Sequence, residues 1–317
     1  MKECHIPSKN CIQPLVSILL PTRNRAGILT NCIKSVLQQT YPNWELVIFD
    51  DASNDETIEI VNTFISTNLN IHYHRNRVRQ GLSETRNLAI SSSLGDLIFF
   101  IEDDLALQPD CLTILVDTYF ALTQKNIPTG AVAPRLIATQ REPTGPLTKI
   151  FDYIGESRRK KMQSPCEVDK YTGIIYRNYD KDFNNIIEVM DVHACSLFSR
   201  PLIVQVGGYS NAFNTQNFIL QESDLHFRLR KAGYKLFFQP RAITYHHEAL
   251  NGGCSVGTQK WLTYYYLIRN QTIFLKRNYG VRAIYMIPLF LGYFVYSPIQ
   301  FSAHWLIKKL WRGKSSQ

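Results

Sequence analysis

The sequence has little that would indicate zinc binding, secretion or a repeat architecture. Its seven cysteines form no CxxC pair and no Cys/His cluster with zinc spacing, which favours scattered thiols in a reducing compartment. The opening stretch MKECHIPSKNCIQP has no apolar core of signal-peptide length, so we expect a cytosolic catalytic domain. There is no internal repeat and no long low-complexity tract. The 317 residues are enough for one large domain with an appendage, or for two modest domains.

Composition and charge narrow the class of partner. The 45% hydrophobic content can fill a core, and 19% charged residues are typical of a globular protein. The formal net charge of +9 favours anionic partners such as phosphates, nucleic acid or anionic lipid headgroups. No helix-turn-helix, zinc-finger or aromatic RNA-binding signature accompanies this charge, so we predict no nucleic-acid partner.

Short apolar runs alternate with segments of helical spacing through the first 124 residues. We interpret the runs as buried strands, at 16–20 (VSILL), 46–49 (LVIF), 71–74 and 97–101 (LIFFI). The helical spacings lie at 28–37, 58–65, 82–89 and 110–124. Residues 140–190 predict loops and short strands, and a helix at 224–232 with a Gly233 cap precedes another strand. The fold class predicted is α/β, with a mostly parallel central sheet flanked by helices on both faces.

The C-terminal part has a different pattern. Residues 283–307 contain no Asp, Glu, Lys or Arg, and this length could span a bilayer. Proline, glycine and polar residues interrupt the stretch, and basic residues flank it on both sides: Arg277, Arg282, Lys308, Lys309 and Arg312. One interpretation is a hydrophobic helical hairpin packed on the domain. We favour a segment that lies in, or dips into, the interface of an anionic membrane.

Acidic residues follow two of the predicted strands directly. Asp50 and Asp51 come after LVIF, and Glu102, Asp103 and Asp104 come after LIFFI. Ligands of open α/β sheets bind beyond the carboxyl ends of the strands. Two unit charges about 4 Å apart repel by roughly 4 kcal/mol at an effective dielectric near 20. A divalent cation, Mn²⁺ or Mg²⁺, on a substrate diphosphate would remove that cost. Solvated loop acids or helix caps are the alternative.

Two further groups of polar residues lie in the second half. Glu222 and Asp224 open the helix predicted at 224–232, where acids also serve as ordinary caps. His246 and His247 follow a strand-like run, and a histidine there could join a metal site, although such pairs are more often structural.

Four blocks, in order, resemble the family 2 glycosyltransferases, the inverting enzymes of the type A glycosyltransferase fold. The resemblance runs from about Val16 to Asn278. The sequences of the blocks are VSILLPTRNRAGILTNCIKSVLQQTYPNWELVIFDDASNDET, GLSETRNLAISSSLGDLIFFIEDD, VGGYSNAF with QESDLHFRLRKAGYKLFFQPRAITYHH, and YYYLIRNQTIFLKRNYG. The resemblance implies a nucleotide-sugar donor and a saccharide or lipid-linked acceptor.

The resemblance also implies roles for individual residues. The turn at Pro21 and Thr22 would line the nucleotide, Asp51 or Asp50 would read its base or ribose, and Arg86 would contact the donor phosphates. Arg23, Gly81 and Asp103 are assigned to donor binding with them. Glu102 and Asp104 would hold the Mn²⁺ or Mg²⁺, and His246 would complete that site. Glu222 matches the base position, with Asp224 as the fallback base.

We therefore predict a metal-dependent inverting glycosyltransferase, of hexosyltransferase or rhamnosyltransferase type, in cell-surface polysaccharide or glycan synthesis. The alternative is an inactive nucleotide-sugar-binding or scaffold protein, because Glu102 replaces the commoner Asp and Gln221-Glu222 replaces Glu-Asp. A nucleotidyltransferase lacks support, since no glycine-rich signature follows the first strand. The predicted domains are a polar arm at 1–13, a catalytic domain at 14–250 (donor half about 14–135, acceptor half about 136–250) and a helical membrane-associating segment at 251–317. The expected location is the cytoplasmic face of the cell membrane, peripheral or monotopic.

Overall fold

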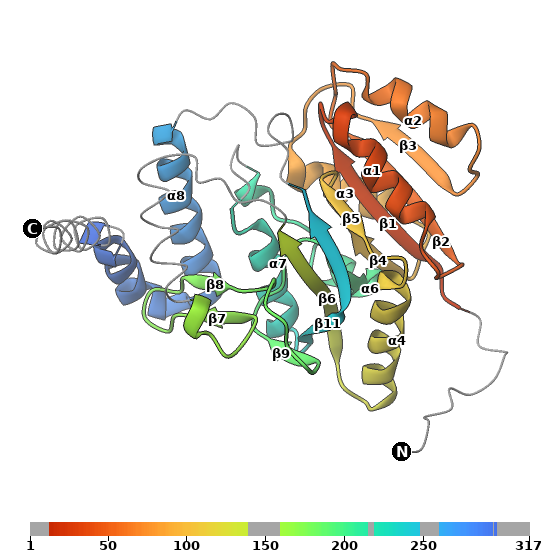
Figure 1. Ribbon diagram of the computed structural model, residues 1–317. Coiled ribbons are helices and arrows are strands. Elements are labelled where there is room, and N and C mark those ends of the chain that lie inside the picture. The colour runs from red at the N-terminus through yellow and green to blue at the C-terminus, as the bar shows by residue number, and fades with distance from the viewer. Residues whose placement is uncertain (1–12, 139–158, 215–218, 248–259, 294, 297–317) are drawn as a thin grey trace, which may run out of the picture.

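The computed structural model describes residues 13–138, 159–214, 219–247, 260–293 and 295–296 (Figure 1). The predicted polar arm at 1–13 lies almost wholly outside these residues. Residues 297–307 of the predicted 283–307 stretch, and the basic residues that follow them, also lie outside the described residues. No helix among the residues described is long and apolar enough to cross a membrane.

The first half of the chain forms the parallel part of a large sheet. Its elements are β1 (Val16–Thr22), α1 (Ala26–Leu37), β2 (Trp44–Asp50), α2 (Thr57–Ile65), β3 (Ile71–Arg75), α3 (Leu82–Ser92) and β4 (Leu97–Phe100). The strands lie side by side in the order β3-β2-β1-β4, and every neighbouring pair is parallel. Each of these strands and helices was predicted from the apolar pattern, and each is confirmed.

The second half extends the same sheet with mixed strand directions and adds a separate two-stranded antiparallel sheet at 166–168 and 175–177. Its elements are β5 (Leu105–Leu107), α4 (Cys111–Gln124), β6 (Thr129–Ala138), β7 (Cys166–Val168), β8 (Ile175–Arg177), β9 (Ile187–Val189), β10 (Leu197–Ser199), α6 (Arg200–Gln205), α7 (Gln221–Lys231) and β11 (Lys235–His246). β6 and β11 are parallel, but β10, β5 and β9 run antiparallel to their neighbours. The sheet is therefore wholly parallel from β3 to β4 and mixed beyond β4. Strands of three residues carry no long apolar run from which a direction could be predicted.

Strand alternation explains why helices cover both faces. Successive side chains of a strand point to opposite faces. Val16, Ile18 and Leu20 of β1 accordingly join a core with α1, α2 and α4, whereas Leu19 of the same strand joins a core with α3, α6 and α7. All four side chains are fully buried. The apolar runs that predicted buried strands thus supply both cores of the sheet.

A third core lies beside the sheet, around α8 (Lys260–Tyr279). Phe274 and Leu275 of α8 pack there with Phe227 of α7 and with Ala283, Met286 and Phe290 of the helical stretch at 283–293. Figure 1 shows α8 and this stretch on the α7 side of the sheet. The first part of the uncharged segment therefore packs on the domain along one of its faces.

The buried carboxylate of Asp191 joins α7 to strand β8. Asp191 is fully buried, and its oxygens accept hydrogen bonds from Arg177 Nη2 at 2.6 Å, Ser223 Oγ at 3.1 Å and His226 Nδ1 at 2.7 Å. Burial alone would raise the pKa of Asp191, but the Arg177 cation and the His226 hydrogen bond lower it to about 2. Because Glu222 lies in the first turn of α7, these contacts also help to fix a predicted site residue.

We predict that Asp191→Asn lowers the free energy of unfolding by about 3–5 kcal/mol at pH 7, because Arg177 then lacks its partner. The folded pKa lies below the unfolded value of about 3.9. This stabilisation is therefore present above about pH 4 and is lost as the pH falls toward 2. Denaturant unfolding at pH 7 and near pH 3 measures both effects. Asp182→Asn is the control, since Asp182 pairs with Arg135 at the surface and is 71% exposed; it should change stability by less than about 1 kcal/mol. An equal loss in the two variants would contradict this role.

Candidate active site

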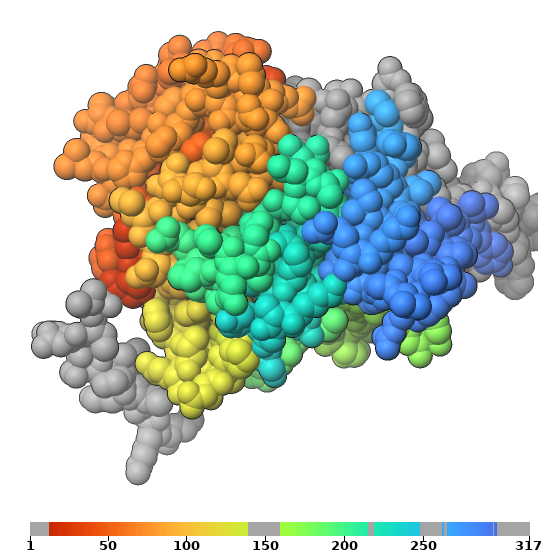
Figure 2. Space-filling view, turned by 180° about the vertical axis from the view of Figure 1, so that it is seen from behind, coloured from red at the N-terminus to blue at the C-terminus, as the bar shows by residue number. Residues whose placement is uncertain are grey.

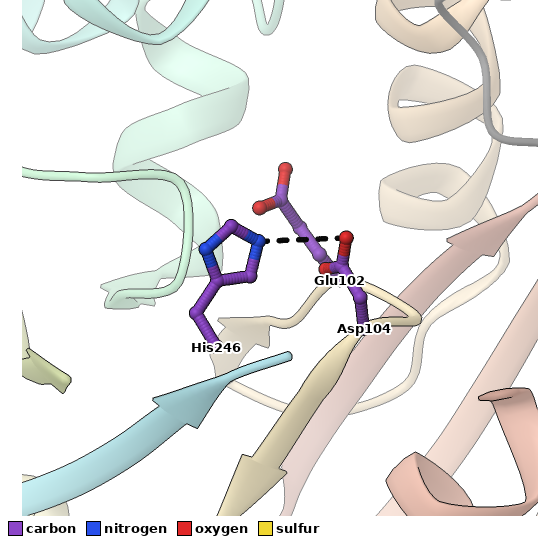
Figure 3. Close-up of side chains that lie close together, drawn as sticks. All are labelled: Glu102, Asp104 and His246. Atoms are coloured by element: carbon purple, nitrogen blue, oxygen red, sulfur yellow. Dashed lines mark ion pairs between the residues drawn. The ribbon is translucent and has the colours of Figure 1, made fainter. Parts of the chain in front are cut away.

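Strand pairing brings three candidate metal ligands together. The turn between β4 and β5 carries Glu102 and Asp104, and antiparallel pairing of β5 with β11 sets His246 opposite Leu105. The backbone N–H of His247 donates to the carbonyl of Asp104 at 2.9 Å, which continues this pairing past the strand end. Ligand atoms of Glu102, Asp104 and His246 all lie within 4.8 Å of one another (Figure 3). The predicted metal residues therefore converge, from segments more than 140 positions apart.

The side chains present fit a divalent cation. Two carboxylates and one imidazole are a donor set that suits Mn²⁺, and carboxylates also suit Mg²⁺. Oδ1 of Asp104 is buried and has no hydrogen-bond partner among the described residues, while its Oδ2 lies 3.4 Å from Nε2 of His246. Burial raises the pKa of Glu102, and the neighbouring Asp104 and Glu222 raise it further, while Arg86 opposes the rise. A bound cation would relieve the repulsion that these neighbours exert.

Asp103 points to the other side of the same turn. Its Oδ2 accepts a hydrogen bond from Thr22 Oγ1 at 2.8 Å, so the end of β1 is fastened to the acidic turn. Burial raises the pKa of Asp103 to about 7, with a further contribution from Asp104, and against the effects of Arg25 and Thr22. The contact joins two of the residues that the resemblance assigns to donor binding.

Arg86 connects the acidic turn to the start of α7. Its side chain is 1% exposed; Nη1 donates to Glu222 Oε1 at 2.5 Å and Nη2 to Glu102 Oε1 at 3.4 Å. The guanidinium stacks over the ring of Tyr209, with 5.1 Å between Cζ and the ring centroid. Arg86 is therefore a buried residue and not a surface helix arginine with an exposed ion pair. In this structure it pairs with carboxylates, and its predicted contact with the donor phosphates stays a prediction.

The two acids of α7 have different surroundings. Glu222 is 19% exposed, and its Oε1 also accepts from Gln221 Nε2 at 3.1 Å. Asp224 is fully buried between Arg228 and Arg277, each 2.9 Å from one of its carboxylate oxygens. Arg228 in turn donates to the carbonyls of Val206 and Gly208, and these bonds hold the turn at Gly207 and Gly208. These contacts favour Glu222 over Asp224 as the candidate base.

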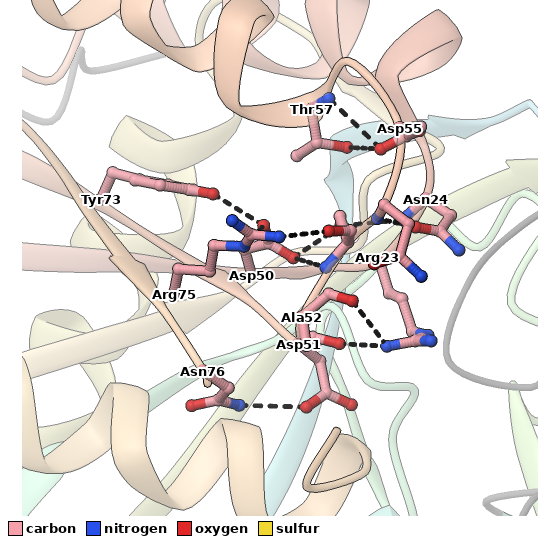
Figure 4. A network of polar contacts seen from close by, with 12 residues as sticks. Arg23, Asn24, Asp50, Asp51, Ala52, Asp55, Thr57, Tyr73, Arg75 and Asn76 are labelled. Atoms are coloured by element: carbon pink, nitrogen blue, oxygen red, sulfur yellow. Dashed lines mark hydrogen bonds and ion pairs between the residues drawn. The ribbon is translucent and has the colours of Figure 1, made fainter. Parts of the chain in front are cut away.

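The two acids after β2 are engaged by protein donors (Figure 4). Asp50 accepts from Ser53 and, at 2.6 Å, from the Tyr73 hydroxyl, and it lies 3.5 Å from Nε of Arg75. These contacts hold the loop after β2. Asp51 instead accepts from the backbone N–H groups of Gln80 and Gly81 at the start of α3, and from the side chain of Asn76.

The donor-binding prediction for these two acids remains untested, and Asp51 is the better candidate. Its contacts place it beside the end of α3 that carries Gly81, whose φ of +85° is a conformation that glycine tolerates. A Cβ at this position would lie 2.3 Å from Oδ1 of Asn214, so glycine also satisfies a close approach. Pro21 and Thr22, predicted as a turn, are the last two residues of β1. Arg23, which follows them, donates to the carbonyls of Asp51 and Ala52 and so ties the ends of β1 and β2 together.

Three residues of the site were not predicted from the sequence. Tyr209 supports Arg86; Gln221 is buried and accepts a hydrogen bond from Ser83 Oγ at 2.7 Å, which joins α7 to α3. Arg25 lies 3.9 Å from both Asp103 and Asp104. A basic residue just after the Pro21–Thr22 turn was the available signal for Arg25. The other two contacts depend on tertiary packing that no local pattern encodes.

We predict a strong energetic coupling between Arg86 and Glu222. Arg86→Met leaves Glu102 and Glu222 without their shared cation and should destabilise the fold by about 3–5 kcal/mol. Glu222→Gln in the same chain should recover part of this loss, with an interaction energy of at least about 1 kcal/mol in a double-mutant unfolding cycle. The exposed pair Lys235–Glu188, at 2.8 Å, is the control and should couple by less than about 1 kcal/mol. Additive losses at Arg86 and Glu222 would show that their contact is energetically unimportant.

A family model and curated proteins of related sequence match this chain. The family model "Glycosyl transferase family 2" matches residues 17–206. The chain is 38% identical over 104 residues to the putative colanic acid biosynthesis glycosyl transferase WcaA of Escherichia coli, over 32% of this chain and 37% of WcaA. It spans about a third of the length of the curated relatives it matches, with shares of 28% and 36% for two of them.

Solved structures resemble the fold. The Staphylococcus aureus TarS fragment 1–349 in complex with UDP-GlcNAc superposes with a TM-score of 0.58 at 14% identity, over 87% of this chain and 71% of that one. GalNAc-T7 with UDP, GalNAc and Mn²⁺ gives a TM-score of 0.61 at 16% identity, over 84% and 48%. The family match covers more than half of the 317 residues, and together with the converging acids it shows that this chain belongs to glycosyl transferase family 2.

Proposed function

We propose that this protein is a metal-dependent inverting glycosyltransferase that transfers a sugar from a nucleotide-sugar donor to a saccharide or lipid-linked acceptor. One observation carries the proposal: the Glu102, Asp104 and His246 group is joined through buried Arg86 to Glu222, a partly exposed carboxylate at the first turn of α7. A leaving-group site and a candidate base therefore share one edge of the sheet. The alternative, a protein that binds the nucleotide sugar without turnover, gives Glu222 no task beyond its ion pair with Arg86.

The chain's own residues have distinct tasks in the proposed reaction. Glu222 takes the proton from the acceptor hydroxyl as its oxygen attacks the anomeric carbon, and a single displacement of this kind inverts the configuration. Arg86 orients Glu222 and places positive charge beside the departing nucleoside diphosphate. Glu102, Asp104 and His246 would hold Mn²⁺ or Mg²⁺, which supplies electrostatic stabilisation of the leaving group when bound. Asp51 fixes the start of α3 and thus the position of Arg86.

The proposed substrates follow from the relatives. WcaA is named for colanic acid biosynthesis, and TarS and GalNAc-T7 were solved with UDP-linked ligands or UDP. By analogy we propose a hexosyl or rhamnosyl donor and a role in cell-surface polysaccharide or glycan synthesis. The support for Mn²⁺ is the same, because GalNAc-T7 was solved with that ion.

A donor screen tests the proposal. Purified full-length protein is incubated with UDP-, GDP- and dTDP-sugars and Mn²⁺, and release of the nucleoside diphosphate is measured. We expect turnover with at least one donor. Asp104→Asn should lose at least about 100-fold of this release. Glu222→Gln should lower it by about 10²–10⁴-fold while nucleotide binding stays, because water takes the place of the acceptor hydroxyl in this assay.

The control for the screen is Glu59→Gln, which removes an exposed acid of α2 and should leave turnover unchanged. Protein that binds a nucleotide sugar tightly but releases no nucleoside diphosphate, with or without metal, would support the binding-protein alternative. Loss of turnover in all variants together, the control included, would indicate a folding defect instead, which unfolding midpoints reveal.

We also propose that the region after α8 contacts an anionic membrane surface on its cytoplasmic side. Ala283, Met286 and Phe290 face the third core, but Ile284 and Leu289 between them are 75% and 47% exposed. Figure 2 shows α8 and the residues after it, in blue, gathered at one side of the molecule. Lys276 and Arg282 are exposed and come just before these apolar residues in the chain, where anionic headgroups would pair with them.

Flotation with phosphatidylglycerol vesicles tests this contact. Wild-type protein should float with the vesicles at low salt, and Ile284→Glu combined with Leu289→Glu should stay at the bottom, because charge on the apolar face opposes insertion. These substitutions are preferable to removal of residues 281–317, which would also take Met286 and Phe290 from the third core. Leu69→Glu is the control, since Leu69 is 95% exposed in the loop between α2 and β3. Wild-type protein that fails to float would contradict the proposal.

A further inference from the structure

Arg25 is a second cation beside the acidic turn. It lies between β1 and α1, its side chain is 11% exposed, and Nε is 3.9 Å from Asp103 Oδ1 while Nη1 is 3.9 Å from Asp104 Oδ2. These distances are too long for hydrogen bonds. Both nitrogens are buried, and neither has a hydrogen-bond partner within the described part of the chain. The guanidinium therefore contributes charge to the turn while two of its nitrogens keep unused donors.

The contrast with Arg86 separates the tasks of the two cations. Nη1 of Arg86 donates to Glu222 and Nη2 to Glu102, so both terminal nitrogens have carboxylate partners, and only its Nε lacks a partner within the described residues. Arg25 faces Asp104, and the Oδ2 atom that it approaches is the one that lies 3.4 Å from Nε2 of His246. A divalent cation between Asp104 and His246 would share that oxygen with Arg25. Like charges so close to one atom repel strongly where water is scarce.

We propose that Arg25 makes binding of the divalent cation depend on the nucleoside diphosphate. In the free protein the fixed charge of Arg25 opposes the cation. When diphosphate oxygens arrive, they neutralise this opposition and accept hydrogen bonds from the unused Nε–H and Nη1–H donors, as a guanidinium favours. The cation and the nucleotide thus strengthen each other's binding, and by thermodynamic linkage the factor is the same in both directions. The inference rests on the proposed function.

A purely structural task for Arg25 predicts something else. If Arg25 served only to balance Asp103 and Asp104, its loss would destabilise the fold and leave two carboxylates repelling each other. Cation binding would then rise equally with and without nucleotide. Dependence on the nucleotide is the property that separates the two interpretations, because only the proposed arrangement gives Arg25 a partner on the diphosphate.

Electron paramagnetic resonance of free Mn²⁺ measures the binding directly, without turnover. Full-length wild type, Arg25→Gln and Arg25→Lys are titrated with MnCl₂ alone and with saturating UDP, GDP or dTDP. We expect weak Mn²⁺ binding by wild type alone and much tighter binding with a nucleotide. Arg25→Gln should bind Mn²⁺ alone at least about tenfold more tightly, while the gain from nucleotide falls by at least about tenfold. Arg25→Lys keeps the charge and should stay near wild type in the absence of nucleotide.

Lys34→Gln is the matched control. It removes one positive charge from the exposed side of the same helix, about 13 Å along the axis from Arg25, and should leave both affinities unchanged. The inference is overturned if wild type shows the nucleotide-dependent gain and Arg25→Gln retains it in full, or if Arg25→Gln alone binds Mn²⁺ no more tightly than wild type. If wild type binds no Mn²⁺ with or without any of the three nucleotides, metal dependence in the proposed function fails, and this inference fails with it. Unfolding midpoints confirm that each variant is folded.

Discussion

Repulsion between carboxylates at one sheet edge is the constraint around which the site is built. Glu102, Asp103, Asp104 and Glu222 lie near one another, and burial raises the pKa of Glu102 and Asp103 because their charges are poorly solvated. Arg86 offsets this charge with short hydrogen bonds and Arg25 with longer contacts. The two cations do not neutralise four acids. A bound divalent cation would neutralise the remaining negative charge. The fold therefore keeps an excess of negative charge at the place where the chemistry is proposed.

The sequence predicted the parts of this arrangement that depend on local patterns. Continuous apolar runs identified β1, β2 and β4, and strand ends located Asp51 and Asp104, because both features are periodic or adjacent in the chain. The approach of His246 to Asp104 depends on pairing of the three-residue β5 with β11. Its position after a strand-like run allowed a histidine there to join a metal site, and the family resemblance singled out His246. Asp50 and Asp51 were equivalent in sequence, and the structure distinguishes them by their partners: Tyr73 and Arg75 for one, the start of α3 for the other.

Ion pairs also decide how the second half of the chain is attached. Asp224 looked like a possible base because it opens a helix next to Glu222, yet it lies fully buried between Arg228 and Arg277. No local pattern could show this, since Arg277 belongs to α8, over fifty positions away. Through Arg228 the same carboxylate supports the turn at Gly207 and Gly208, both with positive φ. Of the two acids in the first turn of α7, Asp224 thus maintains the framework, and Glu222 stays partly exposed for the proposed chemistry.

This division of roles means that the candidate base and the leaving-group site are not positioned independently of each other. Arg86 is held from one side by the ring of Tyr209 and from the other by two carboxylates. Tyr209 follows the turn at Gly207 and Gly208 that Arg228 supports. The side chain of Asn87, the residue after Arg86, donates to the backbone carbonyl of Tyr209 and accepts from its backbone N–H. A displacement of α7 would therefore move Glu222, Arg228 and the turn together, and with them the ring beneath Arg86. Because Arg86 also contacts Glu102, any such displacement reaches the metal ligands as well. The position of the candidate base and the charge at the diphosphate site are consequently set by one connected network, in which α3 and α7 act as a unit.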